Sequence, residues 1–218
     1  MKPISIPQST EPLKILCLGA HSDDIEIGCG ATLIELAERN PRPEFRWVVW
    51  SACGDRAREA ALGARTFLGP SSEAEAEFHG FRDGYFPTQF GEIKDAFEVL
   101  ARDFRPDVVF THYRDDRHQD HRVISDLTWN TFRNHVILEY EIPKWDGDVG
   151  QPNYYIPICR EIAERKITSL MKVFQTQRSK DWFSPETFTS ILRLRGIESR
   201  AGDGFAEAFH ARKLVSTL

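Results

Sequence analysis

Two short polar clusters carry the residue types that metal-dependent chemistry needs. The first is His21-Ser22-Asp23-Asp24, and the second, far along the chain, is His118-Gln119-Asp120-His121. Catalytic zinc commonly takes three protein ligands from His, Asp and Glu and keeps one position for water. His21, Asp24 and His121 would supply such a set, so we expect a zinc site at which the two clusters meet.

The remaining residues of the clusters suggest acid and base groups. In a turn, positions three apart can converge on one point, which would leave Asp23 beside the metal and within reach of a bound water. A carboxylate there can accept the water proton as a general base. His118 and His121 are also three apart, and at the start of a helix they would share one face, so one can bind the metal while the other gives a proton. The pattern predicts metal-assisted hydrolysis.

Simpler interpretations exist for the same residues. A His or Asp after a strand is often only a turn or capping residue. Gly28 and Gly30 could begin a phosphate-binding loop, but the third glycine of G-x-G-x-x-G is replaced by Leu33. We expect these two glycines to allow a tight turn and close packing against a sheet. The other histidines are interpreted as structural: His79, His112, His135 and His210.

Strand-like runs alternate with helical patterns along the chain, which predicts an α/β fold with a mostly parallel sheet covered by helices on both faces. The predicted strands are 14–18, 45–50, 75–81, 107–112, 135–142 and 154–158, and 206–214 is ambiguous between strand and helix. The predicted helices start near residues 30, 59, 93, 123, 162 and 185, the last with Ser184 as its N-cap. The first cluster follows the strand 14–18 after Gly19-Ala20, and the second lies in the polar loop 113–121 after the strand 107–112. In parallel sheets ligands bind beyond the carboxyl ends of the strands, so the topology agrees with the proposed chemistry.

Size and composition set broader limits. The 218 residues, 41% of them hydrophobic, are expected to form a single domain over 1–218. The formal net charge of −5 gives no general attraction to nucleic acid. Four cysteines are scattered without a C-x-x-C pair, which favours the reducing cytoplasm. No apolar run is long enough for a membrane span or a signal peptide, so we expect a soluble, unprocessed protein.

The motifs resemble those of the LmbE-like or PIG-L family of zinc-dependent N-deacetylases. The run A-H-S-D-D-I-E-I-G-C-G-A-T is similar to the family's A-H-P-D-D motif, and R-P-D-V-V-F-T-H-Y-R-D-D-R-H-Q-D-H to its later H-x-D-H motif. The resemblance covers the first 130 or so residues. Weaker echoes occur at Arg58-Glu59, Leu68-Gly69 and Ala206-Glu207-Ala208-Phe209.

The resemblance implies a Rossmann-like three-layer sandwich and removal of an acetyl group from an N-acetylated amino sugar or sugar conjugate. It implies Zn²⁺, or another divalent metal such as Fe²⁺, held by His21, Asp24 and His121. Asp23 would be the base that activates the metal-bound water, and His118 would protonate the departing amine.

The chain departs from the family pattern at two places. Ser22 replaces the proline of A-H-P-D-D, and Asp116 stands where one branch of the family carries a tyrosine that helps to stabilise the oxyanion. Tyr113 is an alternative donor. Arg56 and Asp83 are candidate substrate contacts from their positions after strands, although a solvated arginine and a turn aspartate are equally good interpretations.

Two rival functions stay open. One is a zinc hydrolase of another amide or ester, and the other is a non-catalytic protein that holds a sugar nucleotide or a metal on the same fold. Aromatic residues in loops could stack on a sugar, or belong to the core or to a homo-oligomer interface: Tyr85-Phe86, Trp145 and Tyr154-Tyr155.

Overall fold

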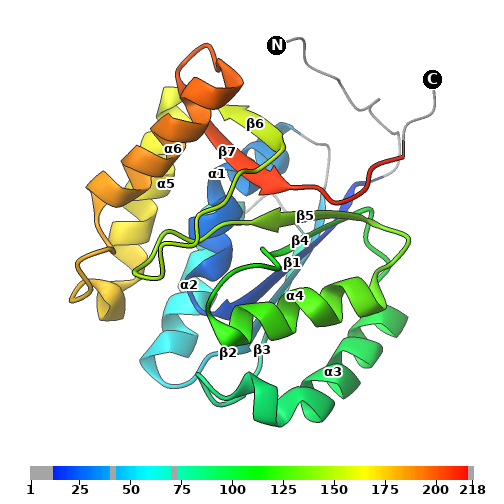
Figure 1. The fold of residues 1–218 in the computed structure, drawn as a ribbon. Coiled ribbons are helices and arrows are strands. Elements are labelled where there is room, and N and C mark those ends of the chain that lie inside the picture. Colours follow the sequence, from blue (N-terminus) through cyan, green and yellow to red (C-terminus); the bar gives the residue numbers. More distant parts are fainter. Residues whose placement is uncertain (1–11, 40–42, 70–72, 216–218) are drawn as a thin grey trace.

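The computed structural model describes residues 12–39, 43–69 and 73–215, and this part of the chain forms one seven-stranded sheet with helices on both faces (Figure 1). The strands are β1 (Lys14–His21), β2 (Glu44–Ser51), β3 (Glu73–Phe78), β4 (Val108–His112), β5 (Val136–Tyr140), β6 (Tyr154–Ile158) and β7 (Phe205–His210). The helices are α1 (Asp24–Arg39), α2 (Asp55–Leu68), α3 (Phe90–Asp103), α4 (Gln119–Thr131), α5 (Arg160–Val173) and α6 (Pro185–Ser199), with short 3₁₀ helices η1 (Phe86–Gln89) and η2 (Gln175–Gln177).

The sheet has the strand order β3-β2-β1-β4-β5-β7-β6. The first five strands are parallel, whereas β7 runs antiparallel to β5 and β6 antiparallel to β7. This topology confirms the predicted three-layer α/β fold with a mostly parallel sheet. It also makes β1 and β4 neighbours, so their carboxyl ends lie side by side.

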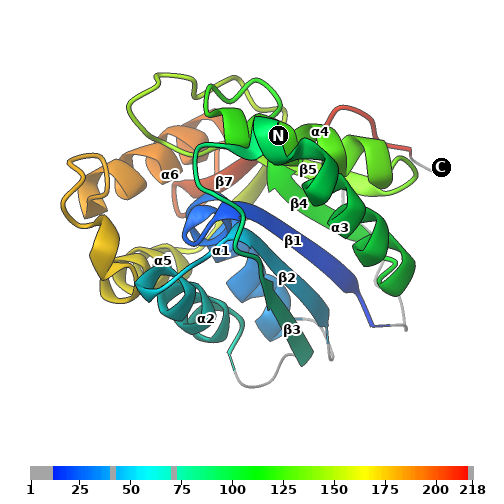
Figure 2. The same cartoon turned by 90° about the horizontal axis from the view of Figure 1, so that it is seen from below.

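Two apolar clusters fill the space between the sheet and its two helix layers. Along β1 the side chains alternate: Ile15 and Cys17 join the core under α1, α2, α5 and α6, whereas Leu16 and Leu18 join the core under α3 and α4. Figure 2 shows these two layers on opposite sides of the sheet. Both faces of the strand are buried, which explains why the sequence reads as a continuous apolar run.

Helix α1 begins earlier than the sequence pattern indicated. We expected the helix from Gly30 and a turn at the two glycines, but the helix starts at Asp24 and includes both of them. A Cβ on Gly28 would overlap the ring of Tyr140 in β5, and one on Gly30 would press on Phe67 in α2. The predicted turn is therefore wrong, and the glycines serve close packing of the helix.

The other boundaries show smaller differences. Helix α2 begins at Asp55 rather than Glu59, and α6 continues past Leu194 to Ser199. Ser184 is the N-cap of α6, as predicted, and its hydroxyl accepts a hydrogen bond from the Thr187 backbone N–H at 3.3 Å. The ambiguous C-terminal segment contains strand β7.

A buried ion pair ties β7 and α5 to the middle of α1. Lys166 Nζ lies 2.6 Å from Glu207 Oε1 and donates to the backbone oxygen of Ile27 at 2.6 Å. The Glu207 carboxylate accepts from the backbone N–H groups of Ala31 at 2.9 Å and Thr32 at 2.7 Å. Residues 27 and 31 are one turn apart, and in a regular α-helix the backbone N–H of residue 31 donates to the backbone oxygen of residue 27. The pair thus holds in place the helix that starts at Asp24.

No helix in the described residues is both long enough and apolar enough to cross a lipid bilayer.

Replacing Gly28 by alanine should destabilise the protein, because the added methyl group has no room against the Tyr140 ring. Overpacking of this kind costs about 1–3 kcal/mol, which urea denaturation can measure. The matched control is Gly91→Ala in α3, where nothing lies near the added atom. That variant should be as stable as the parent or slightly more so, and equal effects at the two sites would contradict the packing argument.

Glu207→Gln should lower the free energy of unfolding by about 3–5 kcal/mol, because it leaves the buried Lys166 ammonium without its counter-charge. The double variant Lys166→Met with Glu207→Gln should lose less stability, since neither residue of this pair is then charged. The neighbouring Arg165 forms an exposed pair with Glu38, so Arg165→Gln should change stability by less than about 1 kcal/mol. A double variant that is less stable than Glu207→Gln alone would refute this account.

Candidate metal centre and active site

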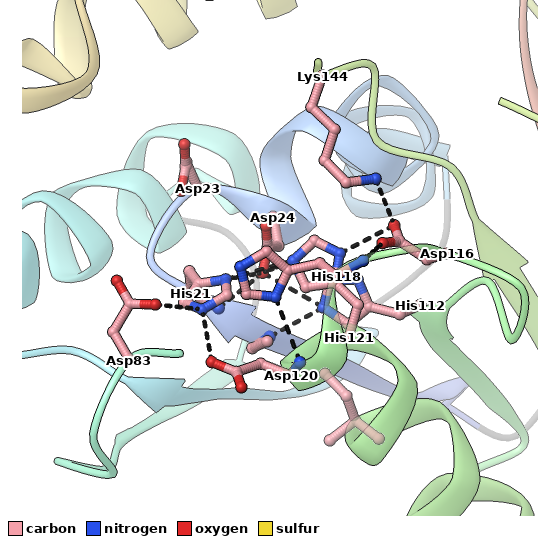
Figure 3. Close-up of polar contacts among 12 residues, drawn as sticks. His21, Asp23, Asp24, Asp83, His112, Asp116, His118, Asp120, His121 and Lys144 are labelled. Carbon is pink, nitrogen blue, oxygen red and sulfur yellow. Dashed lines mark hydrogen bonds and ion pairs between the residues drawn. The ribbon is translucent and has the colours of Figure 1, made fainter. Parts of the chain in front are cut away.

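The two polar clusters meet at the carboxyl ends of β1 and β4. His21 is the last residue of β1, Asp24 is the first of α1, and His121 lies in the first turn of α4. Figure 3 shows their side chains pointing toward one another. The prediction that these distant segments come together is therefore confirmed in the geometry.

Three side-chain atoms of these residues form a small triangle. His21 Nδ1 lies 3.3 Å from Asp24 Oδ2 and 3.3 Å from His121 Nε2, and His121 Nε2 lies 3.5 Å from Asp24 Oδ2. Ligand atoms bound to zinc at about 2.0–2.2 Å in a tetrahedral site are about 3.3–3.6 Å from one another. The residues present therefore fit a single small cation with one further position open.

Carboxylates hold the outer nitrogens of the two imidazoles. His121 Nδ1 lies 2.9 Å from Asp116 Oδ2, and His21 Nε2 lies 3.3 Å from Asp120 Oδ2. Because each outer nitrogen donates to a carboxylate, the inner nitrogen is the one left to present a lone pair to a metal. The orientation of both rings is thus fixed before any cation binds.

The carboxylates are themselves anchored. Asp116 accepts from Lys144 Nζ at 3.0 Å and from the His118 backbone N–H at 2.8 Å. Asp120 accepts from the backbone N–H groups of Gly84 at 2.6 Å and Phe86 at 3.1 Å. Both acids are buried, so these bonds are little exposed to competition from water.

The electrostatics of the triangle suit a cation. Burial alone would raise the pKa of Asp24, but interaction with the imidazoles of His121, His112 and His21 outweighs burial and holds the pKa well below its usual value. Burial, together with His112, lowers the pKa of His121 to about 3, so this ring is neutral, as a metal ligand must be. Burial opposes protonation of His21 too, yet Asp24 and Asp120 raise its pKa well above the ordinary value. A bound cation would take the place of that proton.

His118 lies beside the triangle as the N-cap of α4. Its Nδ1 accepts a hydrogen bond from the Asp120 backbone N–H at 3.2 Å, so the proton of the neutral ring is on Nε2. Its ring centroid is 4.8 Å from that of His21 and 4.6 Å from that of His121. Burial and the neighbouring His21 lower its pKa.

Asp23 is buried but does not contact the triangle. Its Oδ1 lies 2.6 Å from Arg56 Nη2 in α2, and Figure 3 shows the carboxylate apart from the imidazoles. Arg56 Nη1 in turn lies 3.9 Å from Glu59 Oε2 and 3.5 Å from Thr176 Oγ1. The predicted base and one predicted substrate contact are therefore paired with each other.

Asp83, the other predicted substrate contact, reaches the cluster. Its Oδ1 lies 3.1 Å from His21 Nε2, while its side chain is 75% exposed. The hydrogen bond from His21 lowers the pKa of Asp83 to about 2, against the opposing effect of partial burial. Asp83 thus offers an ionised, accessible carboxylate beside the buried donors.

Other groupings of possible donors overlap with the triangle. They are His21 with His118 and His121; His21 with Asp83, His118 and Asp120; and Asp24 with His112 and His121. His112 Nε2 already accepts from the Ala20 backbone N–H at 2.9 Å, and the Asp120 oxygens accept two backbone N–H groups. Asp24 Oδ2 likewise accepts from the His21 backbone N–H at 2.6 Å, so the triangle is preferred because it joins the two clusters with a spacing of 3.3–3.5 Å.

Sequence reasoning did not assign roles to Asp120 and Lys144. It noted Asp116 only as the residue that stands where one branch of the family carries a tyrosine. Asp120 could have been noticed, since it is the acid directly before His121, but Lys144 carries no signal of its own. The alternative oxyanion donor, Tyr113, stacks on His210 with ring centroids 3.7 Å apart and bonds Asp115 through its hydroxyl. It is turned to other partners.

Comparison with known proteins finds related sequences over the part of the chain that carries both clusters. Residues 16–132, more than half of the chain, match the PIG-L family, described as GlcNAc-PI de-N-acetylase. A protein of Escherichia coli K12, named uncharacterized deacetylase YaiS, is 32% identical over 170 residues, which cover 72% of this chain and 89% of the relative.

Solved structures share the fold at lower identity. N,N′-diacetylchitobiose deacetylase from Pyrococcus horikoshii has a TM-score of 0.68 and 22% identity, with 90% of this chain and 82% of that chain covered. GalB, the 4-carboxy-2-hydroxymuconate hydratase of Pseudomonas putida KT2440, has a TM-score of 0.72 and 15% identity, with 94% and 98% covered. The fold thus carries more than one reaction, and the family assignment comes from the sequence match. The chain belongs to the PIG-L, or LmbE-like, family of deacetylases.

Proposed function

We propose that the protein is a metal-dependent N-deacetylase that hydrolyses the acetamide of an N-acetylated amino sugar or sugar conjugate. The observation that carries this proposal is the triangle of His21 Nδ1, Asp24 Oδ2 and His121 Nε2, whose spacing of 3.3–3.5 Å suits one cation. The match to a de-N-acetylase family and the similarity to a chitobiose deacetylase support the choice of bond.

We assign His21, Asp24 and His121 as the residues that would hold the metal, Zn²⁺ by preference and Fe²⁺ as the alternative. Two imidazoles and one carboxylate are a donor set that zinc hydrolases use. When bound, the cation would supply Lewis acidity to the amide carbonyl and lower the pKa of a water molecule.

Asp23 is the proposed general base, and its pairing with Arg56 bears on that role. To accept a proton near the triangle, the carboxylate must turn away from Arg56 Nη2, which is 2.6 Å from it in this structure. Rotation about the side-chain bonds of an aspartate is a small movement, and Arg56 then becomes free to bind a substrate hydroxyl. One movement would thus make Asp23 available as the base and Arg56 available to bind the substrate.

His118 is the proposed acid for the departing amine. As an acid the ring must be the imidazolium, which would give its Nε2 proton to the amine and return to the neutral form; its Nδ1 proton would then replace the hydrogen bond that Nδ1 accepts from the Asp120 backbone N–H in this structure. Asp83 completes the proposed substrate site, because its ionised carboxylate is exposed beside His21 and can accept hydrogen bonds from sugar hydroxyls. Tyr113, the oxyanion donor that the sequence suggested, is stacked on His210, and we do not assign it this role.

Release of acetate from a panel of N-acetyl sugars, with and without a chelator, tests the function directly. Acetate release that the chelator abolishes supports the proposed function. A hydrolase of another amide or ester would release none from the sugars, and a non-catalytic binding protein would bind a sugar without turnover. Four unpaired thiols fit a reducing compartment, and we place the activity in the cytoplasm.

Asp23→Asn and His118→Ala should bind zinc like the parent but lose about 10²–10⁴-fold in turnover, the usual contribution of acid and base groups. His121→Ala should lose the metal itself. Zinc content and kcat are measured on the same preparations. The half-buried His135, which packs on Phe132 and not in the cluster, provides the control His135→Ala, with both values unchanged. Full turnover in Asp23→Asn would end the base assignment.

Asp116→Asn should weaken zinc binding by about 10–100-fold, because the His121 ring loses the charged partner that orients it and raises its basicity. Competition with a chelating dye gives the affinity. Asp115→Asn changes the adjacent, 66%-exposed carboxylate and should leave the affinity as it is. Equal affinity for zinc in the parent and Asp116→Asn would show that the contact does not orient a ligand.

A further inference from the structure

Trp145 is an exposed aromatic residue that is nevertheless held in one orientation. Its side chain is 68% exposed. The indole Nε1 donates to Asp181 Oδ1 at 2.7 Å, and its ring meets the Trp182 ring edge to face at a centroid distance of 6.2 Å. Trp182 is itself partly buried and packs edge to face on Phe183 at 5.7 Å.

The loop that carries Trp145 is anchored at the candidate active site. The preceding residue, Lys144, donates to Asp116 Oδ2 at 3.0 Å, and the same oxygen bonds His121. Lys144 also bonds Asp148 Oδ2 at 2.6 Å, which closes the loop on itself. Trp145 is thus attached, through two side chains, to a proposed metal ligand.

The loop that carries Asp181 is anchored at the opposite side of the site. Thr176 donates to Glu59 from its backbone N–H at 2.8 Å and from its hydroxyl at 2.6 Å. The Thr176 hydroxyl lies 3.5 Å from Arg56, the partner of Asp23. In Figure 1 the loop after β5 runs toward the connection between α5 and α6. The two loops start beside His121 and Asp23 and meet at the bond from Trp145 to Asp181.

We propose that Trp145, with Asp181 and Trp182, forms a platform for a second sugar ring, so that the substrate is an oligosaccharide or a glycoconjugate rather than a free monosaccharide. This inference rests on the proposed function and names a subsite for it. A pyranose has an apolar face and a rim of hydroxyls. The indole offers an apolar face, and the Asp181 carboxylate at its edge can accept hydrogen bonds from the rim.

The fixed orientation is what makes the platform effective. An exposed tryptophan that is free to rotate must lose that freedom when a ligand stacks on it, and this loss opposes binding. Here the hydrogen bond to Asp181 and the contact with Trp182 already restrict the ring. The binding energy of a stacked sugar would therefore be little reduced by ordering of the protein.

The test compares binding of N,N′-diacetylchitobiose and N-acetylglucosamine by calorimetry, using metal-free protein so that turnover plays no part. The parent should bind the disaccharide more tightly. Trp145→Ala should weaken disaccharide binding by about 10-fold and leave monosaccharide binding within about 2-fold. Trp145→Phe keeps an aromatic ring without the hydrogen bond, so its affinity for the disaccharide should lie between those of the parent and Trp145→Ala. Ile197→Ala removes a side chain of similar exposure, 65%, on α6 and should change neither value.

Several results would overturn the platform. They are equal binding of the two sugars by the parent, equal losses for both sugars in Trp145→Ala, and a dimer that dissociates in Trp145→Ala while sugar binding is unchanged. The last would identify the surface as an interface between copies. Acetate release by the metal-loaded parent is measured separately. If the parent releases no acetate but Trp145→Ala loses the preference for the disaccharide, the proposed reaction is refuted while the platform is supported.

Discussion

The convergence of one nitrogen of His21, one oxygen of Asp24 and one nitrogen of His121 is the constraint on which the site depends. These atoms come from positions as much as 100 residues apart, yet lie 3.3–3.5 Å from one another. The group is electrostatically self-consistent, because Asp24 and Asp120 raise the pKa of His21 while the imidazoles around Asp24 lower the pKa of its carboxyl group. The parallel pairing of β1 and β4 makes the convergence possible, because it places the two strand ends at one edge of the sheet.

The rest of the structure fixes the directions of these side chains. Asp116 and Asp120 orient the rings, and Lys144 and the backbone near Gly84 orient the two acids. On the other side of the sheet, the buried pair of Lys166 and Glu207 holds α1, whose first residue is Asp24. Each atom of the triangle is therefore positioned by contacts from elements distant in sequence, which is what the proposed metal site would require.

Sequence reasoning predicted the sheet and the meeting of the clusters, because alternating apolar runs specify a parallel sheet and strand ends specify its functional edge. It placed the start of α1 too late, since two glycines in a helix look like a turn when the ring of Tyr140 that requires one of them is unknown. The Arg56 pair with Asp23 and the Lys144 contact with Asp116 could not be predicted, because each joins segments whose relative positions only the folded chain defines. The same holds for Trp145 and Asp181.

Zinc-edge anomalous diffraction from crystals of the zinc-loaded protein would test the central assignment most directly. We expect one zinc ion at about 2.0–2.2 Å from His21 Nδ1, Asp24 Oδ2 and His121 Nε2, with the outer nitrogens still bonded to Asp120 and Asp116. A zinc ion on the other nitrogen of His21, bound with Asp83 and His118, would contradict that assignment.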